Sequence, residues 1–163
     1  MELEKQNYKV VVPSMPNTDN PVIEKWVGHL AEVVGTPDKE TYFIGHSIGC
    51  QTILRYLETI NIPVGGAIFV AGWFNLENME TEEEEITAKP WIQNPIDLEK
   101  VKTVLPQSIL IISDDDPYGA FEENKQRFSE IVTKEIVLPN ADHITDSTCP
   151  EVFSEIESML KPN

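Results

Sequence analysis

The chain has 163 residues, of which 40% are hydrophobic and 25% are charged, a balance typical of globular proteins rather than disordered or fibrous ones. Acidic residues outnumber basic ones by 28 to 12, and the net charge of −16 argues against binding to nucleic acid or to an anionic membrane. The length suits one domain spanning residues 1–163.

The first half of the chain alternates short apolar runs with longer stretches of helical period. The run Tyr8–Val12 is ended by a proline and predicts a strand. Apolar residues then recur at three- and four-residue spacing, which predicts a helix over Pro21–Val34 with one buried face. Further along, Thr41–Gly45 predicts a strand, Ser47–Thr59 a helix and Pro63–Val70 a buried strand.

The same alternation returns in the last third of the chain. Two more strands are predicted at Ser108–Ile112 and Lys134–Leu138, with a helix over Pro117–Val132 between them. The chain closes on a predicted helix at Glu151–Leu160. Because strands that alternate with helices form parallel sheets covered on both faces, we expect an α/β three-layer sandwich with about five parallel strands.

One long segment, Ala71–Leu105, interrupts this alternation. Its acidic run Glu82–Glu85 favours a solvated loop. Two tryptophans of the segment, Trp73 and Trp91, have two interpretations. They either pack beneath the loop or line the wall of a pocket above the sheet.

The chain shows no features of export. Its apolar runs are all shorter than the roughly 18 residues that a transmembrane helix needs. The first six residues lack the basic and then apolar pattern of a signal peptide. Two cysteines, Cys50 and Cys149, are too few for a disulfide scaffold and suit a reducing compartment. We therefore expect a cytoplasmic protein.

The strongest motif is Gly-x-Ser-x-Gly at residues 45–49, between a predicted strand and a predicted helix. This is the context of a nucleophile elbow, a tight turn in which small residues such as Gly45 and Gly49 give clearance around a strained, exposed serine. The motif predicts Ser47 as a nucleophile. It also predicts the backbone amide of Ile48, at the helix start, as an oxyanion donor. The alternative is a serine that only caps the helix.

A serine nucleophile needs a base, and the chain has three histidines. His29 lies in the predicted helix over residues 21–34 and is expected to be structural. His46 adjoins the serine and is expected to line the pocket. His143 follows the last predicted strand, at the carboxyl edge of the sheet where α/β sites are built. His143 is therefore the predicted base.

The acid that orients the base is expected after the preceding strand, where residues 114–116 are three adjacent aspartates. Asp116 stands directly before a proline and is the candidate, with a helix cap as its alternative role. A metal site is a weaker interpretation, because no Ca²⁺-loop glycine or second ligand set accompanies the cluster. The order Ser47, Asp116, His143 is that of an α/β-hydrolase triad, which needs no metal or organic cofactor.

Several segments together resemble the small α/β-hydrolase-fold serine hydrolases related to retinoblastoma-binding protein nine. These segments are Val12–Asn17, Gly45–Gly49, Lys89–Trp91, Ser113–Tyr118 and Asp142–His143. The resemblance implies hydrolysis of an ester or amide through an acyl-serine, with Ser47 as nucleophile, Asp116 as acid and His143 as base. Binding to retinoblastoma protein is not expected, because neither cysteine lies in a Leu-x-Cys-x-Glu motif.

The resemblance also implies an additional strand and a glycine-rich loop ahead of Tyr8. Residues 1–7 contain neither, so we expect a shortened sheet. In the family that strand lies between the segments corresponding to Tyr8–Val12 and Tyr42–Gly45, and its loop supplies the second oxyanion amide. We expect Tyr8–Val12 to pair directly with Tyr42–Gly45, and an amide of Ser14 or Met15 to replace the missing donor. The alternative is a homodimer in which a partner's edge fills the space.

The sequence thus predicts a hydrolase of small-molecule esters or amides, acting as a monomer or homodimer. Loss of one oxyanion donor costs about 10²–10³ in turnover in a well-studied protease, so slow catalysis is expected. The negative charge disfavours highly anionic substrates. The alternative is a catalytically inactive relative whose acidic surface and Trp73–Trp91 segment bind a partner protein.

Overall fold

A parallel sheet forms the centre of the molecule in the computed structural model, which describes residues 2–146 and 148–160. Within these residues the sheet has four strands, all in parallel pairs, in the spatial order β1-β2-β3-β4. They are β1 (Tyr42–His46), β2 (Gly66–Val70), β3 (Ser108–Ser113) and β4 (Lys134–Leu138). The predicted α/β class is confirmed, and each of these strands lies within a few residues of its predicted position.

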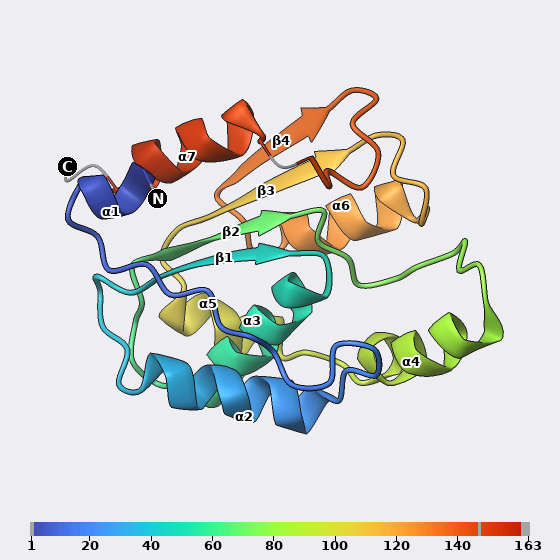
Figure 1. The fold of residues 1–163 in the computed structure, drawn as a ribbon, viewed down its shortest axis with the longest axis horizontal. Coiled ribbons are helices and arrows are strands. Elements are labelled where there is room, and N and C mark those ends of the chain that lie inside the picture. The colour runs from blue at the N-terminus through green and yellow to red at the C-terminus, as the bar shows by residue number, and fades with distance from the viewer. Residues whose placement is uncertain (1, 147, 161–163) are drawn as a thin grey trace.

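Helices cover both faces of the sheet (Figure 1). One face carries α2 (Ile23–Val34), α3 (Ile48–Thr59), α5 (Leu98–Val104) and α6 (Phe121–Ser129), and the other carries α1 (Glu2–Lys5) and α7 (Pro150–Leu160). A further helix, α4 (Glu82–Gln93), lies beyond the carboxyl ends of the strands, beside the start of α2. None of the helices in the described residues is long and apolar enough to cross a membrane.

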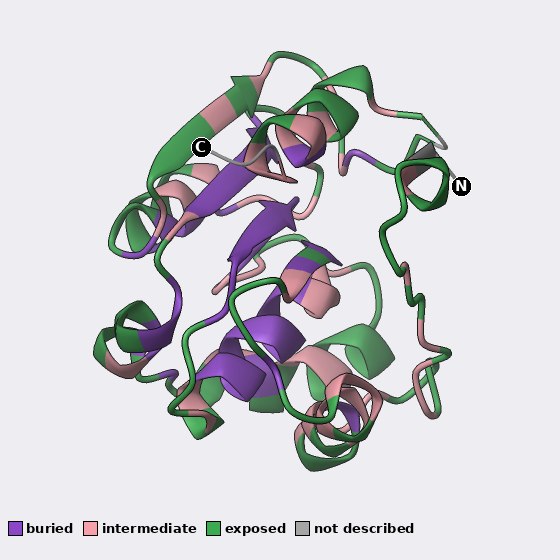
Figure 2. Ribbon diagram, turned by 90° about the vertical axis from the view of Figure 1, so that its left-hand side faces the viewer, coloured by how far each residue is buried: buried purple, intermediate pink, exposed green. Residues whose placement is uncertain are grey.

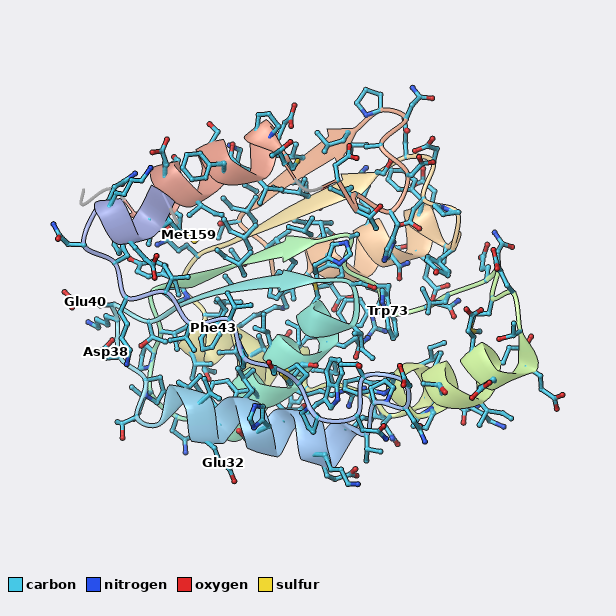
Figure 3. All side chains as sticks on the ribbon, in the orientation of Figure 1. Glu32, Asp38, Glu40, Phe43, Trp73 and Met159 are labelled. Carbon is cyan, nitrogen blue, oxygen red and sulfur yellow. The ribbon has the colours of Figure 1, made fainter. Side chains whose placement is uncertain are left out.

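The two central strands have apolar side chains on both faces. In β2, Phe69 packs in the cluster under α3, α5 and α6, whereas Ile68 packs in the cluster under α7. Every residue of β2 and β3 is buried, as expected for strands covered on both sides. Figure 2 shows this buried centre between exposed outer helix faces. Figure 3 shows Phe43 and Met159, one from each cluster, on opposite sides of the sheet.

The predicted strand at Tyr8–Val12 is wrong. Residues 8–12 belong to no strand, and Val12 is 78% exposed. A groove of about 480 Å³ separates this segment from β1, with Val11 and Met15 on one side and Phe43 on the other. The predicted direct pairing with residues 42–45 is therefore wrong as well, and the described part of the chain forms a sheet of four strands instead of about five.

Two contacts explain why the N-terminal segment stays away from β1. At one end, the Tyr8 hydroxyl donates a hydrogen bond to the carbonyl oxygen of Leu160 in α7, at 3.0 Å. At the other end, the indole N–H of Trp26 in α2 donates to the carbonyl oxygen of Pro16, at 2.7 Å. Because both ends are attached to helices on opposite faces of the sheet, the segment crosses outside β1 rather than beside it.

The segment Ala71–Leu105 contains α4 and α5, so the prediction of a solvated loop at the four glutamates is wrong. The four glutamates are exposed, as expected of a solvated run, but they form the first turn of α4. Thr81 caps the helix: its hydroxyl accepts from the Glu84 amide, and the Glu84 carboxylate accepts from the Thr81 amide. The Thr-x-x-Glu spacing of this capping box is the sequence signal that predicts a helix start here, whereas charge alone does not.

Candidate active site

Ser47 occupies the one-residue turn between β1 and α3. Its backbone has φ 52° and ψ −123°, a strained left-handed conformation that is rare for a residue with a side chain. The Ser47 amide donates to the Val70 carbonyl of β2 at 2.9 Å, and the Ser47 carbonyl accepts from Cys50 in α3 at 2.9 Å. The predicted strand, turn and helix context of the Gly-x-Ser-x-Gly motif is therefore present.

The two glycines of the motif have different roles. A Cβ on Gly45 would lie 2.7 Å from Cδ1 of Ile53 and 2.9 Å from the amide nitrogen of Cys50, so α3 can pack here only against a glycine. A Cβ on Gly49 would meet no atom within 4 Å. The expectation that both glycines provide clearance is correct for Gly45 and wrong for Gly49.

His143 and Asp116 form a close pair beside this turn. The distance between Nδ1 of His143 and Oδ2 of Asp116 is 2.7 Å, and their side chains are 13% and 11% exposed. Because a carboxylate only accepts, the hydrogen lies on Nδ1 and Nε2 is left able to take a proton. The second oxygen of Asp116 accepts from the Tyr118 amide at 3.0 Å, which fixes the orientation of the carboxylate.

The neighbouring aspartates hold the loop that carries His143. Asp114 accepts from the amide of Asn140, and Asp115 accepts from the amide of Asp142, both at 3.0 Å. The Ser113 hydroxyl donates to the Asp115 carboxylate at 2.6 Å, and this bond holds the pKa of Asp115 below its usual range. The bracing is needed because Asn140 and Asp142 have φ of 51° and 46°.

The structure gives each of the three adjacent aspartates different hydrogen-bond partners. Within the described residues, no group of three His, Cys, Asp or Glu side chains is arranged to hold a metal ion. The backbone bonds of Asp114 and Asp115 could not be inferred from spacing, because their partners lie more than 20 residues away.

A cleft of about 550 Å³ joins the candidate residues. Ser47, His143, Trp73 and Tyr118 all line it, and α4 forms a further wall. The only hydrogen bond to Ser47 Oγ in the described part of the chain comes from the indole Nε1 of Trp73, at 3.3 Å. Among the described residues, no hydrogen bond joins Ser47 to His143.

Two aromatic side chains flank the imidazole of His143. The Tyr118 ring meets it edge-on, with 4.9 Å between ring centres, and the His46 ring does so at 5.0 Å. Nε2 of His46 donates to the backbone oxygen of His143 at 2.9 Å. His46 therefore lies next to the base and supports its loop, although it does not line the Ser47 cleft. His29, in α2, does not line that cleft either.

Trp91, a predicted pocket residue, is a packing residue. It is 1% exposed and is absent from the lining of the Ser47 cleft. Its ring meets Trp26 edge-on at 5.9 Å, and both pack with Trp73 in one cluster. The guanidinium of Arg55, in α3, donates to the backbone oxygens of Trp91 and Asn94 and so attaches the end of α4 to α3.

The predicted oxyanion donors differ in whether they line the Ser47 cleft. Ile48 begins α3 directly after Ser47 and lines the cleft, and a first-turn helix amide has no intrahelical acceptor. Ser14 is exposed and Met15 packs against the tryptophan cluster. Neither lines the Ser47 cleft, and Met15 lines the groove beside β1 instead.

Cys50 is the other potential nucleophile near the elbow. It is fully buried, and burial raises the pKa of its thiol. Both Cys50 and Cys149 are free. Cys50 is therefore a protonated packing group beneath the turn and does not compete with Ser47.

Comparison with known proteins agrees with this geometry. A family model described as serine hydrolase matches residues 3–161. The chain is 30% identical over 154 residues to YdeN of Bacillus subtilis, named as a hydrolase, and this match covers 90% of the chain and 78% of YdeN. It is 27% identical over 125 residues to the serine hydrolase RBBP9 of Rattus norvegicus. That match covers 77% of the chain and 64% of RBBP9, so the chain spans less than two thirds of that relative.

Solved structures show the same fold. The crystal structure of the YdeN product has a TM-score of 0.85 at 24% identity, with 97% of this chain and 86% of that chain covered. A carboxylesterase of the thaumarchaeon Nitrososphaera gargenis has a TM-score of 0.63 at 15% identity, with 90% of this chain and 74% of that chain covered.

The space around the two motif glycines differs, so alanine substitutions at Gly45 and Gly49 should differ in their effect on stability. We expect Gly45→Ala to lower the free energy of unfolding by about 1–3 kcal/mol, because its Cβ overlaps α3. Gly49→Ala should leave it unchanged or raise it by about 1 kcal/mol, since alanine is the better helix former in open space. Urea unfolding followed by circular dichroism measures both. Equal effects of the two variants would contradict this account of the turn.

The hydrogen bond from the Asp142 amide to the Asp115 carboxylate, here called the brace, holds the His143 loop and can be tested by hydrogen exchange. We expect Asp115→Ala to raise the hydrogen-exchange rate of the Asp142 amide about ten-fold near neutral pH, because that amide loses a charged acceptor. In the wild type, the brace should persist above the lowered pKa of Asp115 and be lost only as the pH falls through it. Asp146→Asn, in the same region but outside the brace, is the control. An unchanged exchange rate of the Asp142 amide in Asp115→Ala would contradict this role of Asp115.

Proposed function

The chain belongs to the serine hydrolase family, and we propose that it cleaves a small ester or amide through an acyl intermediate on Ser47. The observation that carries this proposal is the arrangement around one cleft. Ser47 lies in a left-handed elbow, and His143 lines the same cleft with Nδ1 2.7 Å from Asp116. A strained serine next to a carboxylate-oriented imidazole is the arrangement that serine hydrolases use.

In the proposed reaction, Ser47 Oγ attacks the substrate carbonyl carbon as its proton moves to Nε2 of His143. The carbonyl oxygen becomes an oxyanion, for which the Ile48 amide is the proposed donor. The intermediate then collapses to the acyl-serine, and His143 gives its proton to the departing alcohol or amine. Water, deprotonated by His143, attacks the acyl carbon, and the proton returns to Ser47 as the acid leaves. Asp116 keeps the imidazole in the required tautomer throughout.

The second oxyanion donor sets the expected rate. We propose an amide of Ser14 or Met15 for this role, but both lie outside the cleft and their segment would have to move toward it. A hydrolase with one donor in place is expected to be slow by about 10²–10³ relative to one with two. We also propose a cytoplasmic location, in keeping with two free cysteines.

A fluorophosphonate probe tests the reaction directly. We expect it to label the folded protein at Ser47, and His143→Ala to reduce the labelling rate by at least about 10³-fold because the base is lost. Intact-protein mass spectrometry, with Ser47→Ala as the negative control, measures the label. Failure to label the folded wild type would exclude the hydrolase. Labelling that survives in His143→Ala would exclude the triad.

The charge of the cleft predicts a preference among esters. Asp19, Glu83 and Glu84 line the cleft, and no Lys or Arg among the described residues lines it. We expect kcat/KM for phenyl acetate to exceed that for the anionic monophenyl succinate about ten-fold at low salt, and the gap to narrow at 1 M salt as screening increases. Glu83→Gln should narrow the gap, while Glu122→Gln in α6 should not. Equal rates for the two esters would contradict the prediction.

A second candidate function is that of a catalytically inactive relative that binds a partner protein. The observation that favours it is the apolar groove beside β1, where Val11 and Ile44 are 53% and 49% exposed. A homodimer that covers this edge remains the proposed alternative to a monomer. The tryptophans are a poor binding surface, because Trp73 and Trp91 are 4% and 1% exposed. The fluorophosphonate experiment also separates this candidate from the hydrolase.

A further inference from the structure

The indole of Trp73 contacts the reacting atom of the proposed mechanism. Its Nε1 donates a hydrogen bond to Ser47 Oγ at 3.3 Å. Because an indole N–H can only donate, the serine hydroxyl is the acceptor in this bond, and its own hydrogen stays available for transfer to the base. We propose that Trp73 is a catalytic residue whose N–H stabilises negative charge on Ser47 Oγ. This inference rests on the proposed hydrolase function.

The turn after β2 directs Trp73 toward the elbow. Ala71, the first residue after the strand, has φ 47°, a left-handed conformation that bends the chain sharply. At Gly72 a Cβ would lie 2.5 Å from Cζ of Phe128, so only glycine lets the chain pass this close to α6. Figure 3 shows Trp73 beyond the carboxyl ends of the strands, on the side of α4. The tight turn therefore delivers the indole to the level of Ser47.

Buried polar side chains hold this turn in place. The backbone oxygen of Trp73 accepts a 2.7 Å bond from the amide group of Gln51, a residue 1% exposed in α3. The carbonyl oxygen of the Asn124 side chain, 3% exposed in α6, accepts from the amides of Phe74 and Asn75. Two buried amide side chains thus fix the backbone of Trp73 and of the next two residues. A donor held before the reaction begins costs no reorganisation when charge develops.

The indole ring is equally constrained. It is 4% exposed and packs with Trp26, Trp91 and Ile48 in the cluster between α2, α3 and α4. Each tryptophan N–H in this cluster has its own acceptor. Those of Trp26 and Trp91 donate to backbone carbonyls, of Pro16 at 2.7 Å and Pro21 at 3.1 Å. Only the N–H of Trp73 donates to a group that the proposed reaction changes.

The proposed chemistry places charge on Ser47 Oγ twice in each cycle. Negative charge develops there when His143 removes the proton, before the bond to the carbonyl carbon is complete. It develops again when the acyl-serine is hydrolysed and Oγ leaves. A donor 3.3 Å away strengthens its bond to the oxygen in both steps, and so stabilises the transition state more than the ground state.

A comparison of two Trp→Phe variants tests this role. Trp73→Phe keeps an aromatic ring and removes the N–H, and Trp26→Phe makes the same change in the same cluster at a backbone acceptor. We expect the second-order rate of fluorophosphonate labelling, and kcat for p-nitrophenyl acetate, to fall about 10- to 100-fold in Trp73→Phe with KM little changed. Trp26→Phe should stay within about three-fold of the wild type. Equal rates in the two variants would overturn the inference.

The failure of this inference is distinguishable from the failure of the proposed function. A wild type that is not labelled at Ser47 overturns the hydrolase, and the role of Trp73 with it. A wild type that is labelled at the same rate as folded Trp73→Phe overturns the role of Trp73 alone. Should Trp73→Phe not fold, 3-benzothienylalanine at position 73 keeps the bicyclic shape and removes only the N–H. The same 10- to 100-fold loss is then expected, and wild-type rates would refute the proposal.

Discussion

The left-handed backbone of Ser47 is the constraint on which the rest of the site depends. A single residue joins β1 to α3, so the helix leaves the strand end directly and packs against Gly45, where a Cβ has no room. Such a conformation costs on the order of 1–3 kcal/mol and persists only where its surroundings hold it. Here the Val70 carbonyl of β2 holds the Ser47 amide, and the buried face of α3 holds the other side of the turn.

The parallel sheet brings four such strand ends together. One residue around the cleft follows each strand: Ser47 after β1, Trp73 after β2, Asp116 after β3 and His143 after β4. Parallel strands end at the same edge, so residues far apart in the sequence become neighbours there. The loops that carry these residues are irregular. Polar side chains such as Asn124 and Asp115 accept hydrogen bonds from backbone amides of the loops and so fix their conformation.

The two edges of the sheet differ in how they are protected. β4 carries exposed Lys134 and Glu135, and charges of this kind discourage pairing with other chains. β1 contains no Asp, Glu, Lys or Arg, and its outer side faces a groove rather than a strand. The sequence predicted that Tyr8–Val12 would pair at this edge. It did not indicate that Tyr8 and Pro16 would be attached to α7 and α2, because those bonds link residues distant in the chain.

By itself the sequence determined the α/β class, the positions of four strands, and the elbow at Ser47, because each follows from local periodicity or a contiguous motif. It also identified Asp116 and His143 as candidates from their places after successive strands. Only the tertiary structure decided the roles of Asp114 and Asp115, the burial of Trp91, the helix at the four glutamates and the contact of Trp73 with Ser47. The helix at the four glutamates has a local signal in its capping box. The other features are set by packing and hydrogen bonds between distant segments, which neither periodicity nor spacing encodes.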